Sequence, residues 1–394
     1  MRYAILDILR GIALLGICLA NYPEFALYTF QTNEFVQAMP TAHIDEIVKY
    51  IQYIFIDGKF YTLFSLLFGI GFSIIMSKTI DGKNDRTSFF YSRMILLALI
   101  GTAHMFLLWA GDILLLYALL GMLLPLFRNL SNRKLLIISA ILIAFPIAVN
   151  TFIAITGTDL ALPAKQANQY FNQVVGITDE TFPIWLMEKE TYLDVLKFNL
   201  AGFFVRCQEF IDGNRIFNVL GLFILGLYIG RNKLFIENDT NNALIKKVRN
   251  YGLLFGFPLS ILYGWNAMNG YFGLVGSTVL YTVSVYPLGL AYAATIYLWY
   301  INHKQSILLN LLAAPGRMAL TNYVGQSFIG MIIFYGVGFS LALKFGLVYI
   351  ELVAIAVFLF QIAFSNVWLR YFQYGLLEWI WRMLTYKKWL KLMK

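Results

Sequence analysis

The chain has 394 residues, of which 60% are hydrophobic and only 13% are charged. Soluble domains carry about 25% charged residues, so this composition excludes an ordinary soluble domain and favours an integral membrane protein. Three histidines and two cysteines, Cys18 and Cys207, provide neither a disulfide framework nor the spacing of metal ligands. We therefore expect a membrane protein without a resident metal ion.

About ten apolar segments are each long enough to cross a membrane as a helix. No long polar linker separates them, so residues 1–394 are expected to form a single, all-helical membrane domain. The first segment lacks the cleavage site of a signal peptide and is expected to remain as a helix. The predicted spans are residues 4–22, 60–76, 89–110, 113–127, 135–155, 216–230, 251–268, 274–301, 318–339 and 347–369.

The net charge of +9 comes mainly from lysine and arginine residues in short segments between the apolar spans. This distribution marks the cytoplasmic side of a membrane protein and argues against nucleic acid as a partner. Basic segments follow the second, fourth, sixth and eighth spans, and another forms the tail 370–394. Both chain termini are therefore predicted to face the cytoplasm.

The segment 156–214 is predicted to lie outside, because acidic residues outnumber basic ones in it. Structureless loops of this length are uncommon, so part of it is expected to be helical. Residues 193–210 are apolar with interspersed charges, and residues 42–55 share this character. Both stretches predict amphipathic helices at the outer membrane surface.

His104 lies inside the third predicted span, whereas the other two histidines fall in predicted loops. At about 1.5 Å per residue, it sits about 10 Å below the corner at Gly111, in the outer half of the membrane. A lone buried histidine is usually hydrogen-bonded to a neighbouring helix and has no further role. Histidine is also the side chain best suited to proton transfer near neutral pH. His104 is therefore a candidate general base.

Asp112 follows at the turn between the third and fourth spans. An aspartate before an apolar run commonly caps the next helix. The alternative is that Asp112 orients His104, which requires the helix to break near Gly111. We weigh the two interpretations equally.

Asp7 and Arg10 are one helical turn apart at the start of the first span. This spacing allows an ion pair that anchors the helix end. In the functional interpretation, Arg10 offers its charge to an anionic ligand that enters from the cytoplasm.

The ninth span contains Thr321, Asn322, Gln326 and Ser327, which are too polar for a lipid-facing stripe. Asn322 and Gln326 are four residues apart and share one helix face. Hydrogen bonds between helices are the ordinary explanation, and a polar cavity is the interpretation that we favour. Other candidate binding residues at the ends of spans are Asn21, Arg215 and Arg317.

Several motifs occur in an order that resembles the YeiB-like family of bacterial multi-pass membrane proteins. The resemblance covers nearly the whole chain, although each motif alone is short. The motifs are LDILRGIALLGI at 6–17, FYTLFS at 60–65, FGIG at 68–71, His104, GDIL at 111–114, YALLG at 117–121, GRMALTNY at 316–323 and GLLEWIWR at 375–382.

The YeiB-like family is similar to a wider group of transmembrane acyltransferases, which includes lysosomal glucosamine N-acetyltransferase and bacterial polysaccharide O-acyltransferases. The resemblance implies a protein of the bacterial cytoplasmic membrane that takes acyl-CoA from the cytoplasm and an acceptor from outside. In this hypothesis His104 is the general base, and Asn21 or Asn322 stabilises the oxyanion. Arg10 and basic loop residues would bind the CoA phosphates.

Two other classes of function stay open. A transporter or exporter could use the same polar cavity, because an intramembrane histidine and ion pair also suit proton-coupled transport. The sequence shows neither inverted repeats nor paired broken helices, which weakens this alternative. A receptor or scaffold could instead bind a ligand through the outer segment. The acceptor, the acyl chain and the oligomeric state, a homo-oligomer included, are left open.

Overall fold

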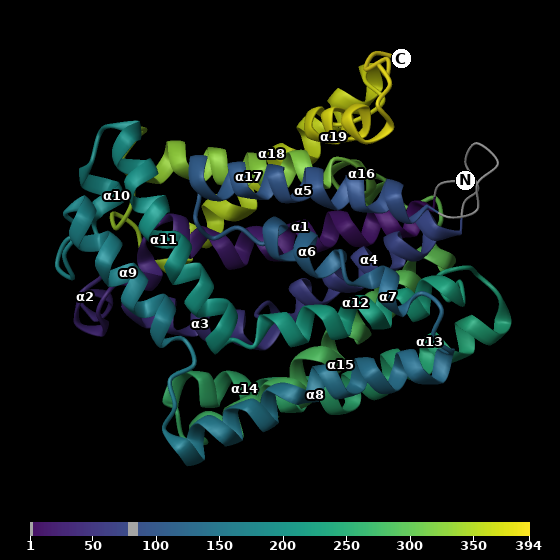
Figure 1. Ribbon diagram of the computed structural model, residues 1–394, viewed down its shortest axis with the longest axis horizontal. Helices are drawn as coiled ribbons and strands as arrows, with labels where there is room; N and C mark the ends of the chain where they lie inside the picture. The colour runs from purple at the N-terminus through teal and green to yellow at the C-terminus, as the bar shows by residue number, and fades with distance from the viewer. Residues whose placement is uncertain (1–2, 78–85) are drawn as a thin grey trace.

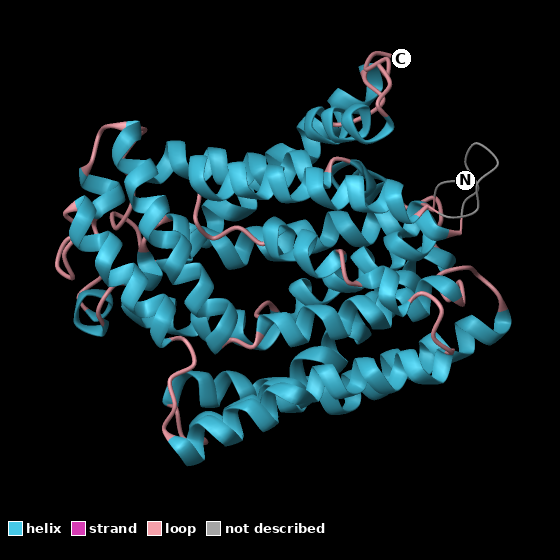
Figure 2. Cartoon of the chain, in the orientation of Figure 1, coloured by secondary structure: helices cyan, strands magenta, loops and turns pink. Residues whose placement is uncertain are grey.

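The computed structural model describes residues 3–77 and 86–394, and these two ranges contain helices and loops but no β-strand (Figure 2). The prediction of an all-helical fold is confirmed. The helices are α1 (Ala4–Phe25), η1 (Tyr28–Phe30), α2 (Asn33–Gln37), α3 (Ala42–Phe55), α4 (Lys59–Met76), α5 (Thr87–Leu107), α6 (Leu114–Gly121), α7 (Leu124–Phe127), α8 (Asn132–Thr156), α9 (Leu162–Val175), α10 (Trp185–Glu188), α11 (Tyr192–Asp212), α12 (Arg215–Arg231), α13 (Asp239–Tyr251), η2 (Gly252–Gly256), α14 (Phe257–Asn269), α15 (Gly273–Asn302), α16 (Ile307–Arg317), α17 (Ala319–Phe334), α18 (Leu347–Tyr371) and α19 (Leu376–Tyr386).

Six helical units among the described residues are long and apolar enough to cross a membrane. They are α1, α3 with α4, α5, α8, α15 and α18. A seventh results if α11 and α12, which are bent by 66° at Gly213 and Asn214, form one broken span. The predicted count of about ten spans was therefore too high for continuous helices of spanning length.

Three predicted spans are shorter or interrupted. The span 113–127 divides into α6 and α7, and α7 carries a proline in its first turn, where the missing N–H is tolerated. The span 251–268 starts as the π-helical turn η2 and continues as α14. The span 318–339 ends early, because the backbone of Tyr335 is extended. Because of these breaks, the helices are shorter than the continuous apolar runs in the sequence.

The two predicted amphipathic stretches form helices, but neither is separate from the apolar bundle. Residues 193–210 belong to α11, which packs against α5 and α9 and leads into α12. Residues 42–55 form α3, which joins α4 in a single apolar unit of 35 residues.

Glycines allow the central helices to approach closely. A Cβ atom built on Gly11 of α1 would lie 1.9 Å from the carbonyl oxygen of Leu312 in α16. A Cβ atom on Gly316 of α16 would lie 1.8 Å from the carbonyl oxygen of Asp7. Small residues let helix backbones pack in this way inside membranes. The α1–α16 crossing therefore requires glycine on both helices.

The C-terminal helix α19 lies at the edge of the bundle and is tied to α17 (Figure 1). The carboxylate of Glu378 accepts hydrogen bonds from the backbone N–H groups of Leu320 and Thr321, at 2.7 and 3.2 Å, and from the Thr321 hydroxyl at 2.6 Å. These donors belong to the first turn of α17, where a helix has no internal acceptors. Burial raises the pKa of Glu378 above its usual range. Glu378 is thus the cap of α17.

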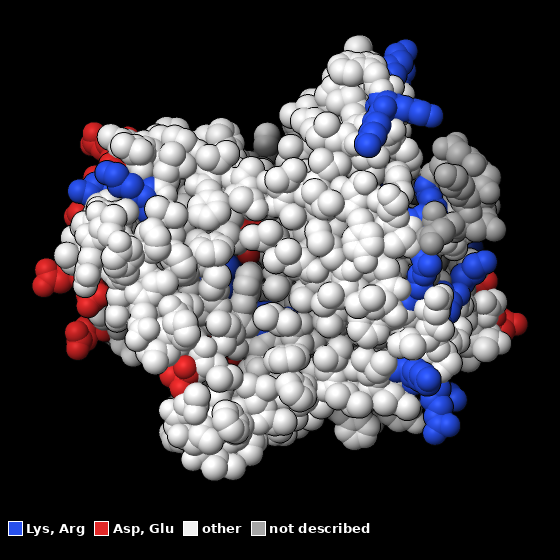
Figure 3. Space-filling view, viewed as in Figure 1, with Lys and Arg blue, Asp and Glu red and all other residues white. Residues whose placement is uncertain are grey.

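Charged side chains gather at opposite ends of the molecule. Figure 3 shows mainly acidic side chains at the end formed by α2, α9 and α10, and mainly lysines and arginines at the end near α13. Basic residues concentrate on the cytoplasmic side of membrane proteins. We therefore expect the end with α13 to face the cytoplasm.

Cysteine labelling tests this orientation. In a Cys207→Ser background, Asp179→Cys is expected to react with a membrane-impermeant maleimide in intact cells, because Asp179 is exposed at the acidic end. Lys247→Cys on α13 is the matched control and is expected to react only after permeabilisation. The reverse pattern would invert the topology.

Candidate functional site

His104 lies in the last turn of α5 and is buried, with 3% of its surface exposed. The helix ends at Leu107, three residues before the predicted end at Ala110. The N–H groups of Leu108 and Trp109 both donate to the His104 carbonyl, which closes the helix. The chain then turns back toward α6, so that the residues after the turn can reach His104.

Asp112 uses its two carboxylate oxygens for different purposes. Oδ2 lies 2.8 Å from Nδ1 of His104, and Oδ1 accepts the backbone N–H of Leu115 in the first turn of α6 at 2.8 Å. Both interpretations of Asp112 therefore apply, as helix cap and as partner of His104. The helix break that the second interpretation required is present. This break brings Asp112 to His104, because α5 ends before Gly111.

Ser327 of α17 completes a series of three buried polar side chains. Its Oγ lies 2.8 Å from Nε2 of His104, and Ser327 and Asp112 are 1% and 0% exposed. An ionised carboxylate can only accept hydrogen bonds, so with Asp112 ionised the Nδ1–H of His104 donates to it. Nε2 is then left to accept the Ser327 hydroxyl. This aspartate–histidine–serine arrangement is that of a base poised to remove a hydroxyl proton.

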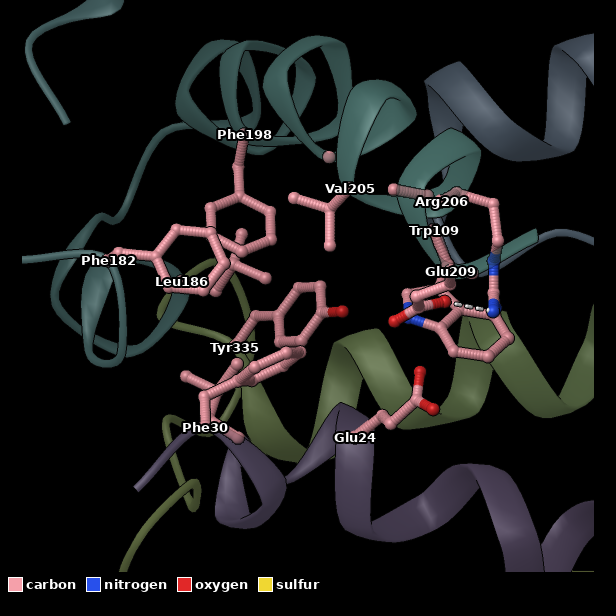
Figure 4. A pocket seen from close by; sticks show the side chains of 14 residues that line it. Glu24, Phe30, Trp109, Phe182, Leu186, Phe198, Val205, Arg206, Glu209 and Tyr335 are labelled. Atoms are coloured by element: carbon pink, nitrogen blue, oxygen red, sulfur yellow. Dashed lines mark hydrogen bonds and ion pairs between the residues drawn. The ribbon is translucent and has the colours of Figure 1, made fainter. Parts of the chain in front are cut away.

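A small pocket of about 40 Å³ lies beyond Trp109, whose ring centroid is 6.4 Å from that of His104. One half of the pocket is polar: Arg206 contacts Glu209 at 2.5 Å, and the carboxylate of Glu24 points toward them (Figure 4). The other half is apolar and is lined by Phe30, Phe182, Leu186, Phe198 and Tyr335. The pocket thus joins a polar and an apolar half, in a volume well below the range of about 300–1,000 Å³ of small-molecule sites.

Gly111 keeps this pocket open on the side of His104. A Cβ atom at Gly111 would lie 2.1 Å from the Trp109 ring and 2.5 Å from Nη2 of Arg206. Only a residue without a side chain fits beside these two groups.

Asn322 and Gln326 do not face His104. The Asn322 amide donates to Ser365 at 2.9 Å, and the Gln326 amide donates to Gln361 at 2.9 Å. Both acceptors belong to α18, so the ordinary explanation of hydrogen bonds between helices applies to this face. The polar cavity that we favoured for Asn322 and Gln326 stays a prediction.

The remaining predicted residues lie at several places in the bundle. Arg10 and Asp7 form an ion pair at 3.0 Å, and the Arg10 side chain is 29% exposed. Arg215 starts α12, with its guanidinium 4.9 Å from the centroid of the Tyr61 ring. Asn21 is half-buried on α1, and Arg317 is half-buried at the end of α16.

Sequence reasoning assigned no role to Ser327, Glu24, Trp109, Arg206 or Glu209. Ser327 follows Asn322 by five residues, which places it about 140° away around the helix, so it was a candidate for a separate face. Glu24 lies two residues beyond the predicted end of the first span, whereas α1 continues to Phe25, so the sequence did not mark its carboxylate. Among the described residues, no group of three or more histidine, cysteine, aspartate or glutamate residues could hold a metal ion.

Comparison with known proteins supports the resemblance to the YeiB-like family. Residues 229–388 match a family described as a protein of unknown function, DUF418. The chain is 28% identical to the uncharacterised protein YeiB of Escherichia coli, over 98% of this chain and 96% of YeiB. It is similar to YeiB along nearly its whole length.

A second relative, the uncharacterised protein YxaH of Bacillus subtilis, is 29% identical over 98% of this chain and 95% of YxaH. An uncharacterised 39.9 kDa protein encoded in the amylase 3′ region of Bacillus acidopullulyticus is 28% identical over 98% of this chain and 94% of its own length. No solved structure matches the chain. The names of these relatives state no activity.

Proposed function

We propose that this protein is a membrane acyltransferase in which His104 is the general base. The observation that carries the proposal is the pair of 2.8 Å contacts from the two ring nitrogens of His104, one to Asp112 and one to Ser327. An oriented imidazole beside a hydroxyl is the usual means of activating a nucleophile for acyl transfer. Its burial among helices α5, α6 and α17 excludes bulk water, which would otherwise hydrolyse an activated acyl group.

The proposed chemistry has two steps. In the first, Nε2 of His104 takes the Ser327 proton as Oγ bonds to the carbonyl carbon of an acyl thioester. The carbon–sulfur bond breaks, and the departing sulfur receives that proton from His104. In the second, His104 takes a proton from an acceptor hydroxyl or amine, which bonds to the acyl carbon, and Ser327 leaves and regains the proton.

The proposed donor is acyl-CoA from the cytoplasm, and the proposed acceptor comes from the outer side of a bacterial cytoplasmic membrane. The pocket beside Trp109 supports this direction, because Arg206 and Glu209, which line it, belong to the segment 156–214 that is predicted to lie outside. Asn21 stays the proposed oxyanion donor, since the Asn322 amide is bonded to Pro315 and Ser365. Arg10 stays a proposed contact of the CoA phosphates, with its charge partly neutralised by Asp7.

Mass spectrometry of the intact protein tests the first step. After incubation with acetyl-CoA in lipid nanodiscs and no acceptor, the wild-type protein is expected to gain one acetyl group at Ser327. Ser327→Ala and His104→Ala are expected to abolish this gain. Ser365→Ala is the matched control, because Ser365 is equally buried but contacts Asn322 instead of His104. Absence of both acetylation and His104-dependent CoA release from the wild-type protein would refute the proposal.

Solute transport is the second candidate, and one observation favours it. The 66° bend between α11 and α12 is a discontinuity of the kind that transporters use at their binding sites. Carriers of that kind have paired discontinuous helices, whereas only one such bent pair occurs among the described residues. His104-dependent solute flux into proteoliposomes without acyl consumption would favour transport.

A further inference from the structure

A larger pocket lies at the basic end of the molecule, away from His104. It has a volume of about 430 Å³, within the range of about 300–1,000 Å³ that small-molecule sites occupy. The ends of α4 and α12 form two of its walls. The described residues that line it are Tyr3, Phe72, Ser73, Ile74, Met76, Ser77, Arg128, Leu227, Gly230, Arg231, Lys233 and Phe235.

The polar lining of this pocket is cationic. Arg128, Arg231 and Lys233 line it, and no acidic side chain is among the lining residues in the described part of the chain. Ser73 and Ser77 add hydroxyl groups beside these cations. Guanidinium, ammonium and hydroxyl groups together are the donors that recognise phosphate oxygens.

The simplest alternative is that these cations only neutralise the carbonyl groups at helix ends. Arg231 does so in part, because it donates to the backbone carbonyls of Leu130, at 2.6 Å, and of Arg128. These two bonds use two of the five guanidinium donors and hold the group in place. The backbone carbonyls at the helix ends therefore explain the position of Arg231. They accept hydrogen bonds from only two of its five N–H donors.

The backbone of Lys233 forms the C-terminal cap of α12, where its N–H donates to the Gly230 carbonyl and the Leu234 N–H donates to the Ile229 carbonyl. Its backbone adopts the left-handed conformation, with φ of 51°, and its carbonyl accepts hydrogen bonds from Ile236 and Asn241. The side chain is exposed at the pocket, and its backbone is held firmly by these contacts. Lys233 thus lines a ligand-sized cavity with a positively charged side chain, which extends from a backbone held in place.

We propose that this pocket binds a phosphate-bearing ligand with an apolar portion, which is either a soluble nucleotide-like molecule or the headgroup of an anionic lipid. The apolar wall of Phe72, Leu227 and Phe235 would accommodate the part of the ligand next to the phosphate. The proposal does not rest on acyl transfer, because ligand binding can be measured without any reaction.

Two binding measurements on the full-length protein test the proposal and distinguish the sources of phosphate. The first is equilibrium dialysis of radiolabelled coenzyme A against protein in phosphatidylcholine nanodiscs, with pantetheine as a competitor that lacks phosphate. The second is native mass spectrometry of protein in detergent supplied with equal amounts of dioleoylphosphatidylglycerol and dioleoylphosphatidylcholine.

We expect selective binding of coenzyme A or of phosphatidylglycerol, and Lys233→Glu is expected to weaken it about tenfold, because an attraction becomes a repulsion. Lys233→Arg is expected to retain it. Lys247→Glu is the matched control, since it changes the net charge equally on an exposed position of α13 outside the pocket.

In the dialysis experiment, equal competition by pantetheine and by unlabelled coenzyme A would contradict recognition of the phosphate groups of a soluble ligand. In the mass spectrometry experiment, equal retention of phosphatidylglycerol and phosphatidylcholine would contradict recognition of an anionic lipid headgroup. The proposal is overturned if neither arm shows phosphate-selective binding to the wild-type protein, or if Lys247→Glu weakens binding as much as Lys233→Glu.

Discussion

Replacing Asp112 with asparagine is expected to lower the rate of CoA release from acyl-CoA by roughly 10²- to 10⁴-fold. In the wild-type protein, the carboxylate accepts from Nδ1 of His104 at 2.8 Å, which leaves Nε2 free to take the Ser327 proton. An asparagine that keeps its oxygen on the Leu115 N–H must turn its NH₂ group toward His104. Nδ1 then accepts, the proton moves to Nε2, and the base is lost.

The measurement is the initial rate of thiol release by the protein in nanodiscs. His104→Ala is measured for comparison, and its rate is expected to fall by a similar factor. The two replacements together should lose little more than either alone, because both remove the same base. Asp112→Ala serves as a structural comparison, because it also removes the cap of α6 and should cost about 1 kcal/mol of stability. Full activity in Asp112→Asn would exclude the proposed role of the His104–Asp112 contact.

Gly11→Ala is expected to destabilise the protein by roughly 3 kcal/mol. The added methyl group would lie 1.9 Å from the carbonyl oxygen of Leu312, and a backbone atom cannot rotate away as a flexible side chain can. Helices α1 and α16 must therefore separate, which breaks contacts along both. The measurement is the thermal unfolding midpoint in detergent, together with the yield of monodisperse protein.

Gly71→Ala is the control for this substitution, because it makes the same chemical change in α4 at a site with no heavy atom within 4 Å of the new Cβ. It should leave the midpoint nearly unchanged. If the two variants unfold at the same temperature, the close approach of α1 and α16 does not contribute to stability in the way that we infer.

Much of the fold was predictable from two properties of the sequence. The apolar composition indicates that the protein lies in a membrane, and the spacing of residues indicates which side chains share a helix face. The apolar stretches around residues 4–22 and 347–369 correspond to α1 and α18, and each ends within a few residues of its prediction. Interruptions were harder to predict. The end of α5 at Leu107 follows an apolar run that continues without a break, so hydropathy alone could not locate it.

The site was predictable in part for a similar reason. His104 was identifiable because an ionisable group in an apolar span is rare. Its partners depend on how helices face one another. Helical periodicity separates Ser327 from Asn322 and Gln326, but it does not say which of these faces meets α5 and which meets α18. The contacts of α17 with both helices decided that question.

The capping of α17 by Glu378 has a consequence for the order of events during biosynthesis. Glu378 is 57 residues beyond Thr321, so at about 5–20 residues per second the ribosome adds it roughly 3–11 s later. During that interval, the first turn of α17 has no carboxylate to satisfy its N–H groups, and water or lipid headgroups must supply acceptors. The helix that carries Ser327 therefore reaches its final hydrogen bonding only after the tail has been synthesised, and a chain that stops before residue 378 would lack this last step of assembly.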